Sequence, residues 1–252
     1  MSGKGTSSPL VLKLKTTLSR LGLEVSRSGA AQGSRHWRTL TCLRNAGLDV
    51  SLSVDVGAHH GSWSVAVQQL WPLATTLLVE PQRDLATDPR LAGDPTKTVW
   101  IHRGAGPADG SAPFYAGARA DSASFVRSSL KQVNDVEYVH VQRLDSMLGE
   151  CAQGKAPQVL KLDCEGWDLE VLSGLGSLSA SIDAIFIEAA LANPLFKNDI
   201  PSTFAAMRSL GFSPVDIYDA ARDPKTGTLH NVEVCFINEL SIAFPKMSEF
   251  NF

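Results

Sequence analysis

The chain has 252 residues, 44% of them hydrophobic and 19% charged, which fits one globular domain with a modest additional segment. Its formal net charge of -3 leaves no basic surface for neutralising phosphates, so we expect no nucleic-acid partner. The four cysteines form no C-x-x-C pair, which argues against a zinc site or a disulfide scaffold and is typical of a reducing cytoplasm.

No apolar run approaches the roughly 18 residues that a membrane span requires, and residues 1–9 lack the apolar stretch of a signal peptide. We therefore expect a soluble, cytoplasmic protein. The composition indicates nothing about oligomeric state, so a homo-oligomer is left open.

The first elements are helical. Residues 1–9 are small and polar and are predicted to form a flexible terminus. Leucines then recur at helical spacing between Leu10 and Leu21, which predicts a helix that packs on the main domain or, as an alternative, lies on a membrane surface. A second helix is predicted over about residues 35–46, ending at Gly47. Residues 10–49 are thus expected to form an N-terminal helical segment.

From residue 50 to 252, short apolar runs alternate with helical patterns, which predicts an α/β domain built on a mostly parallel sheet. Residues 104–134 lack periodicity and are predicted to be an inserted loop or hairpin. Helices are expected at Ser64–Leu70, Trp167–Leu172 and Thr203–Leu210. Strands are expected at Leu52–Val56, Thr76–Val79, Val99–His102, Val139–Gln142, Val159–Leu162, Ala184–Glu188, Pro214–Tyr218 and Val232–Ile237.

A glycine loop follows the first strand of this domain, between Asp55 and Ser64. Gly57 and Gly61 have no Cβ, so a ligand can approach the backbone closely, and free amides there favour a carboxylate or phosphate. Asp55 is expected either to orient the loop or to reach the amino group of a bound amino-acid moiety. The G-x-x-x-G spacing departs from the G-x-G-x-x-G of dinucleotide sites, which disfavours a nicotinamide cofactor.

An acid ends the next strand. Glu80 follows an apolar run about twenty residues beyond the glycine loop, with Pro81 after it. In a doubly wound sheet this position lies beside the loop, where a carboxylate can accept hydrogen bonds from both hydroxyls of a ribose. The pair of loop and acid therefore predicts a nucleoside-containing cofactor.

Three more acids, Asp163, Glu165 and Glu188, lie at the ends of two later strands. They could bind a hard divalent cation such as Mg²⁺, or one of them could act as a general base on a substrate hydroxyl. Alternatively, Asp163 and Glu165 cap the helix that opens at Trp167. Lys161, in the same strand, is expected to face solvent by default.

These motifs together resemble the FkbM family of methyltransferases over about residues 50–240. The resemblance rests on the glycine loop, Val79-Glu80-Pro81, Arg143-Leu144-Asp145 and the Lys161-Leu162-Asp163-Cys164-Glu165-Gly166 block, with Asp121-Ser122-Ala123-Ser124 similar to a serine-containing loop of that family. The family usually has Asn where this chain has His59, so a contact from that position would be altered.

The resemblance implies a class I methyltransferase fold, which is Rossmann-like and doubly wound with an antiparallel last strand. It also implies S-adenosylmethionine as cofactor and O-methylation of a sugar, polyketide or other small secondary metabolite. Asp163 and Glu165 are then the candidate catalytic residues. The candidate cofactor-binding residues are Asp55, Gly57, Ala58, His59, Gly61, Glu80 and Pro81. A non-catalytic S-adenosylmethionine-binding protein and an NAD-dependent oxidoreductase are the alternatives.

Overall fold

The computed structural model of the chain describes residues 35–83, 85, 93–116, 123–127, 135–152, 154–191, 197–223 and 225–248. The predicted flexible terminus at 1–9 and the predicted helix between Leu10 and Leu21 lie outside these residues. So do Asp121 and Ser122 of the serine-containing loop.

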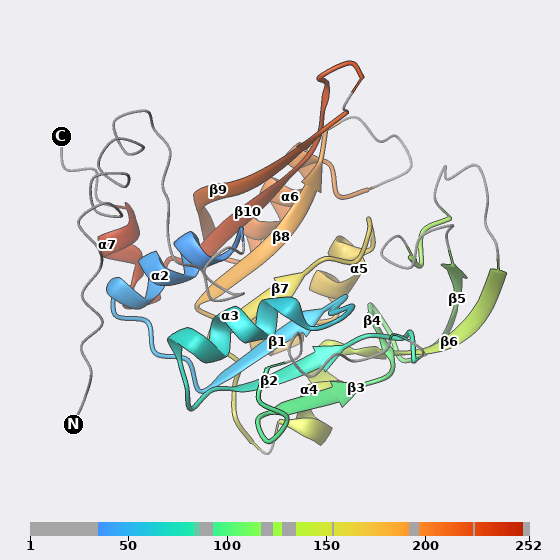
Figure 1. The fold of residues 1–252 in the computed structure, drawn as a ribbon, viewed down its shortest axis with the longest axis horizontal. Helices are drawn as coiled ribbons and strands as arrows, with labels where there is room; N and C mark the ends of the chain where they lie inside the picture. Colours follow the sequence, from blue (N-terminus) through green and yellow to red (C-terminus); the bar gives the residue numbers. More distant parts are fainter. Residues whose placement is uncertain are drawn as a thin grey trace, which may run out of the picture.

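Seven strands form one twisted sheet in the order β3-β2-β1-β7-β8-β10-β9 (Figure 1). All of them run parallel except β10, which is antiparallel to both of its neighbours. Because the chain reverses direction along the strand order at β1 and β7, their carboxyl ends flank the switch point where ligands bind in such sheets. The strands are β1 (Leu52–Val56), β2 (Thr75–Val79), β3 (Thr98–Ile101), β7 (Val159–Leu162), β8 (Ala184–Ala190), β9 (Phe212–Arg222) and β10 (Leu229–Asn238).

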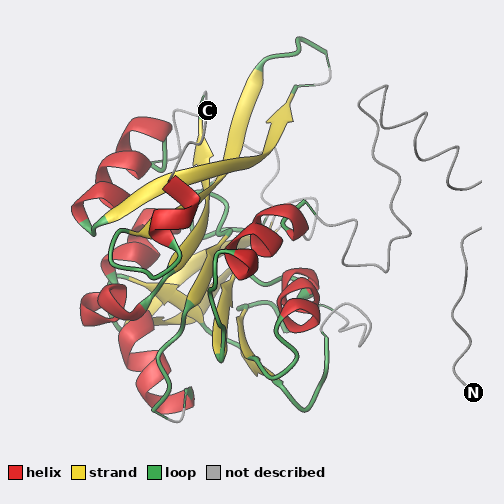
Figure 2. Cartoon of the chain, turned by 90° about the vertical axis from the view of Figure 1, so that its left-hand side faces the viewer, coloured by secondary structure: helices red, strands yellow, loops and turns green. Residues whose placement is uncertain are grey.

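Helices cover both faces of this sheet (Figure 2). One face packs on α2 (Trp37–Asn45) and α3 (Ser62–Leu70), and α7 (Phe244–Ser248) lies at its margin. The opposite face packs on α4 (Leu144–Cys151), α5 (Asp168–Ser173), the 3-10 helix η2 (Gly176–Ser181) and α6 (Ile200–Ser209). The strands are apolar on both sides because each side buries a separate core, as expected for a parallel sheet.

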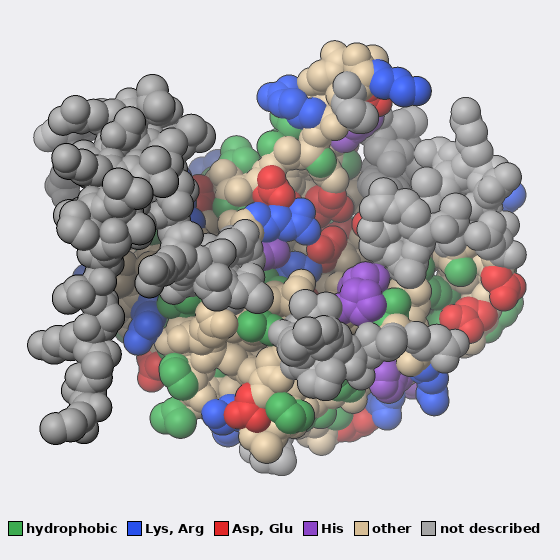
Figure 3. Space-filling view, in the orientation of Figure 1, with side chains coloured by type: hydrophobic (Ala, Val, Ile, Leu, Met, Phe, Trp, Pro, Cys, Tyr) green, Lys and Arg blue, Asp and Glu red, His purple; other side chains and the backbone are tan. Residues whose placement is uncertain are grey.

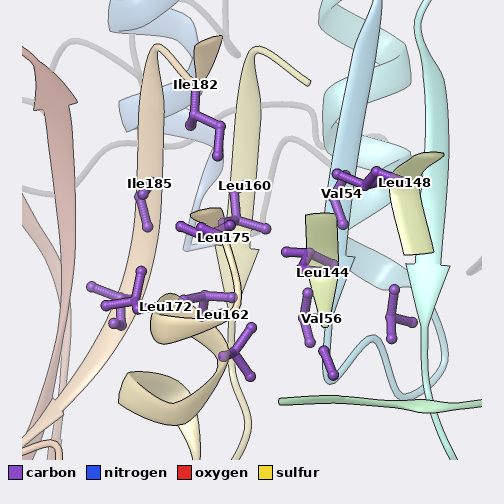
Figure 4. Packing of buried hydrophobic residues seen from close by; sticks show 14 of the residues in the cluster. Val54, Val56, Leu144, Leu148, Leu160, Leu162, Leu172, Leu175, Ile182 and Ile185 are labelled. Atoms are coloured by element: carbon purple, nitrogen blue, oxygen red, sulfur yellow. The ribbon is translucent and has the colours of Figure 1, made fainter. Parts of the chain in front are cut away.

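The core under α4 and α5 shows how the sequence pattern places the site. Figure 4 shows Val54 and Val56 of β1 beside Leu148 and Leu144 of α4, all of which are buried. Leu160 and Leu162 of β7 pack in the same way towards Leu175 and Leu172. This packing fixes β1 and β7 relative to the helices, and the loops that follow the two parallel strands lie at the same edge of the sheet.

A second, three-stranded sheet in the order β4-β6-β5 extends from the main sheet (Figure 1). It consists of β4 (Gly104–Gly106), β5 (Gly110–Ala116) and β6 (Asp135–Arg143). The predicted strand Val139–Gln142 belongs to β6, so it is a longer element than predicted and pairs here instead of in the main sheet. The alternating pattern of β6 gave no sign of which sheet it would join.

Each helix and strand predicted within the described residues is present, with ends that differ by up to four residues. The predicted doubly wound α/β architecture and the reversed last strand are confirmed. Strands β4 and β5 and helix α4 were not predicted separately, because short Gly-rich and Ser-rich stretches carry little periodicity.

Candidate active site

One cavity of about 540 Å³ lies at the carboxyl ends of the central strands. Its wall includes the glycine loop, Glu80 and the acids that follow β7 and β8. In Figure 3 acidic and basic side chains lie close together near the middle of this view. The predicted cofactor-binding residues Asp55, Gly57, Ala58, His59, Glu80 and Pro81 line the cavity, together with Asp163, Glu165 and Glu188.

The glycine loop joins β1 to α3 through two left-handed residues that need glycine. Gly57 has φ +74°, and a Cβ there would lie 1.9 Å from the carbonyl oxygen of Asp163. Gly61 has φ +76° and is the N-cap of α3. Gly57 therefore serves first to let the loops after β1 and β7 approach each other, and Gly61 to turn the chain into the helix.

The amides of the two glycines do not remain free, contrary to the sequence-based expectation. The Gly57 N–H donates to the carbonyl of Val79 at 2.9 Å, and the Gly61 N–H donates to the carbonyl of Ala58 at 2.7 Å. One amide is thus bound by the neighbouring strand β2 and the other within the turn, in keeping with the rule that buried backbone groups are paired. An anionic group at this point would meet the first turn of α3 instead.

Glu80 lies at the end of β2, beside the loop, and is 4% exposed. Its two carboxylate oxygens accept from the backbone N–H groups of His59 and Gln82, each at 2.9 Å. Burial raises the pKa of Glu80, and these two hydrogen bonds partly offset that rise. The Gln82 side chain also donates to Oε1, in a long hydrogen bond of 3.4 Å. Oε2 has a second lone pair, so the carboxylate can still accept a hydrogen bond from a ligand in the cavity.

His59 adopts φ +49°, in the left-handed region where Asn, Asp and His are enriched among residues that are not glycine. Asn, which the family resemblance led us to expect here, suits the same backbone. The exchange therefore preserves the loop geometry, and the backbone N–H of His59 still binds Glu80. The His59 ring packs edge-on against His60 at a centroid distance of 3.9 Å.

Lys161 does not face solvent, so the default expectation for it was wrong. It is 5% exposed, and its Nζ lies 2.9 Å from Asp163 Oδ2 and 3.4 Å from Asp55 Oδ1. Burial acts to lower the pKa of Lys161, but the two carboxylates outweigh it and raise the pKa. Lys161 thus stays charged and cross-links the ends of β1 and β7.

The two carboxylates respond differently to that lysine. Burial raises the pKa of Asp55, and the attraction of Lys161 offsets this only in part. Burial also acts to raise the pKa of Asp163, but Lys161 outweighs it, so the pKa of Asp163 lies below its ordinary value. Asp163 is therefore an ionised partner of Lys161, and Asp55, which is 1% exposed, is engaged in the same cluster.

The three acids do not form a metal site in the described part of the chain. No group of three or more His, Cys, Asp or Glu side chains there is arranged to hold a metal ion. Asp163 is directed to Lys161, whereas Glu188 accepts a hydrogen bond from the side chain of Asn231. The predicted cation site of Asp163, Glu165 and Glu188 is therefore not supported.

The loop after β7 is held by Asp168, which the sequence analysis missed. Asp168 is fully buried and accepts from the amides of Cys164 and Gly166 at 3.1 and 3.3 Å. The side chain of Asn198 donates to Asp168 at 3.0 Å and also to the backbone carbonyl of Glu188 at 3.2 Å. Because burial raises the pKa of Asp168 to about 7, this carboxyl can change its protonation near neutrality.

Glu165 adopts φ +51° within this loop. The Ser124 hydroxyl, from the segment similar to the family's serine-containing loop, donates to the Glu165 carbonyl at 2.9 Å. The helix α5 begins at Asp168 with Trp167 as N-cap, and the Trp167 side chain makes no capping hydrogen bond. Because Asp163 binds Lys161, the alternative in which Asp163 is a helix cap is wrong.

The far wall of the cavity comes from residues that no motif indicated. Glu233 of β10 is 8% exposed and lies 2.5 Å from Arg35 and 3.5 Å from His36. The Tyr218 hydroxyl of β9 donates to Glu233 at 2.7 Å. The only available sequence signal was a charged residue within the apolar run Val232-Glu233-Val234. This cluster connects the segment before α2 to the two last strands.

A comparison with protein families matches the methyltransferase FkbM domain to residues 55–214, from the end of β1 into β9. The chain belongs to the FkbM methyltransferase family. The predicted family is thereby confirmed, and the activity at this level is S-adenosylmethionine-dependent methyl transfer. The matched range of the FkbM domain contains the glycine loop, Glu80 and the acids after β7 and β8. No curated protein matches the chain.

Solved structures similar to this FkbM protein include other methyltransferases. The N-methyltransferase NodS from Bradyrhizobium japonicum WM9 has a TM-score of 0.46 and 6% identity, covering 81% of this chain and 94% of that one. The Burkholderia thailandensis 1,6-didemethyltoxoflavin-N1-methyltransferase, solved with S-adenosylhomocysteine, has a TM-score of 0.43 and 12% identity, covering 94% and 93%. A Streptococcus thermophilus rRNA methylase has a TM-score of 0.43 and 10% identity, covering 80% and 94%.

The helices of the described residues are too short or too polar for a bilayer crossing, and none qualifies as a membrane-spanning segment.

Proposed function

We propose that this FkbM protein transfers a methyl group from S-adenosylmethionine to a hydroxyl of a small-molecule acceptor, such as a sugar or a polyketide. The observation that carries the proposal is the position of Glu80. Its buried carboxylate lies beside the glycine loop and lines the same cavity as the acids after β7 and β8. A cofactor held by Glu80 would therefore reach directly towards an acidic acceptor region.

The residues present fit the cofactor. The cavity of about 540 Å³ falls within the range of small-molecule sites. Glu80 would accept hydrogen bonds from the ribose hydroxyls, and its orientation is already set by the amides of His59 and Gln82. Gly57, Ala58 and His59 would border the methionine part, and Pro81 would lie at the nucleoside end. Gly61, which does not line the cavity, would act by turning the chain into α3. Asp55 acts through Lys161, which keeps the loop ends together.

When bound, S-adenosylmethionine supplies a methyl group on a sulfonium, which is already a good electrophile. The protein then has to align the acceptor oxygen and exclude water, so positioning accounts for most of the rate. Asp163 and Glu165 line the acceptor side of the cavity, where Asp168, Asn198 and Ser124 hold their loop. We assign Asp163 and Glu165 the role of orienting the acceptor.

The experiment that tests this function is transfer of a tritiated methyl group from S-adenosylmethionine to a panel of hydroxylated compounds, with release of S-adenosylhomocysteine as the second readout. Labelled ethers should form from at least one sugar or polyketide-like acceptor. Binding of S-adenosylmethionine without labelled product from any acceptor would favour a non-catalytic binding protein. Binding of NAD in its place would contradict the cofactor assignment.

Replacing Glu80 with Ala should weaken S-adenosylhomocysteine binding about tenfold to a hundredfold, because a hydrogen bond to a charged group contributes about 1.5–3 kcal/mol. Isothermal titration calorimetry measures the affinity. Glu137→Ala, which removes an exposed glutamate from β6, is the matched control and should bind as the wild type does. Equal affinity of the Glu80→Ala variant and the wild type would rule out the ribose assignment.

A further inference from the structure

We propose that Glu188 is the general base that accepts the proton of the acceptor hydroxyl during methyl transfer. This inference rests on the proposed function and selects one of the acids at the acceptor side of the cavity. It assigns to Glu188, and not to Asp163, the one proton transfer that O-methylation requires.

Glu188 has the required position. It lies near the end of β8 and lines the cavity that Glu80 also lines, so both carboxylates face the same space. Its side chain is held from β10, where the Asn231 amide donates to Oε1. Among the described residues nothing donates to Oε2, and no Lys, Arg or His forms an ion pair with this carboxyl. One oxygen is thus oriented and the other is left for the acceptor.

Asp163 is the other candidate for the general base, but its carboxylate forms an ion pair with Lys161. Its Oδ2 binds Lys161 Nζ at 2.9 Å, and Lys161 is also near Asp55. An ion pair of this kind stabilises the carboxylate and makes it a weaker proton acceptor. Among the described residues no cation forms an ion pair with Glu188, so its carboxylate keeps the basicity that Asp163 has lost.

The groups around Glu188 increase the difference in basicity between Glu188 and Asp163. Burial, together with the negative charges of Asp163, Asp168, Glu165 and Glu233, raises the pKa of Glu188 to about 9. These groups face it from the β7–α5 loop, from α5 and from β10. Two neighbouring carboxyls with pKa values shifted in opposite directions are the usual arrangement in which one group transfers protons and the other remains ionised.

The proton and electron balance is simple. The acceptor oxygen forms a bond to the methyl carbon while the carbon–sulfur bond breaks and its electron pair stays on sulfur. The hydroxyl proton passes to Oε2 of Glu188, and the neutral carboxyl then releases it to water. No oxidant, reductant or metal is required for this step.

The kinetic test is the pH dependence of methyl transfer to methyl α-glucoside and catechol as hydroxyl probes. For the wild type, kcat/KM should rise roughly tenfold per pH unit up to about pH 9, because only ionised Glu188 accepts a proton. Glu188→Gln should lower kcat at least about 100-fold and remove this rise. A Glu188→Gln variant that keeps the rise would overturn the proposal.

Asp163→Asn provides the matched comparison. Removing the negative charge of Asp163 should lower the pKa of Glu188, so the rise should move to lower pH and not disappear. Loss of the rise in Asp163→Asn, with the rise kept in Glu188→Gln, would make Asp163 the base instead.

A second readout needs neither cofactor nor acceptor. Because the folded protein holds the Glu188 proton up to about pH 9 and the unfolded chain releases it near pH 4.5, the urea midpoint should fall as pH rises between these values. In Glu188→Gln the urea midpoint should fall less over this pH range than in the wild type, whereas Glu137→Gln should show the same fall as the wild type. Parallel curves for wild type and Glu188→Gln would overturn the assignment, even if S-adenosylmethionine binds. Failure of the proposed function would leave this readout unchanged.

Discussion

Replacing Gly57 with Ala should lower the free energy of unfolding by about 2–6 kcal/mol, the sum of a strained left-handed backbone and an overpacked contact. The new Cβ would lie 1.9 Å from the Asp163 carbonyl oxygen, which is a backbone atom that cannot turn away. The loops after β1 and β7 would have to separate. This would strain the hydrogen bond of 3.0 Å that the Asp163 N–H donates to the carbonyl of Val56. Urea unfolding measures the loss.

Gly227→Ala is the matched control for that variant. Gly227 has φ +71°, but a Cβ there would meet no atom within 4 Å. It should therefore cost only the backbone term, about 1–2 kcal/mol. Equal losses for the two variants would show that close packing of the two loops is not what requires glycine at position 57.

Lys161→Met should lower the free energy of unfolding by about 3–5 kcal/mol, because it removes the buried cation that lies between the buried carboxylate of Asp55 and the partly buried carboxylate of Asp163. The loss should be smaller at pH 5 than at pH 8. Without Lys161, burial raises the pKa of Asp55 further above its unfolded value, so the folded state binds the proton more tightly and loses stability as pH rises. Urea unfolding at the two pH values tests this.

The control for this variant is Lys197→Met. The Lys197 side chain is 79% exposed and forms its ion pair with Glu170 at the surface, where solvent screens the charges. Its removal should change stability little at either pH. A similarly small change for Lys161→Met would mean that Asp55 and Asp163 do not need their cation.

Much of the fold could be predicted because the strands are short apolar runs at regular intervals and the loops between them contain glycine. The position of Glu80 beside the glycine loop could also be predicted, since parallel strands place their carboxyl ends at one edge of the sheet. The buried position of Lys161 could not be predicted from the sequence. A lysine in an apolar strand faces solvent unless a carboxylate on a neighbouring strand lies opposite, and Asp55 belongs to another strand.

The acceptor side of the site was harder to predict for a related reason. Arg35, Asn231 and Glu233 come from opposite ends of the chain and line the same cavity as Glu188 because β10 inserts between β8 and β9. The sequence grouped Glu188 with Asp163 and Glu165 as ligands of a metal, because all three follow strands. The side chain of Asp163 is directed to Lys161, whereas that of Glu188 is directed to Asn231 and has no ion-pair partner among the described residues.

The most direct test of the central claim is a crystal structure of the protein with S-adenosylhomocysteine. We expect both ribose hydroxyls within hydrogen-bond distance of the Glu80 carboxylate, the amino-acid part beside the loop from Gly57 to Gly61, and the sulfur facing Glu188. S-adenosylhomocysteine bound at another surface, or bound in the cavity with its ribose away from Glu80, would contradict it.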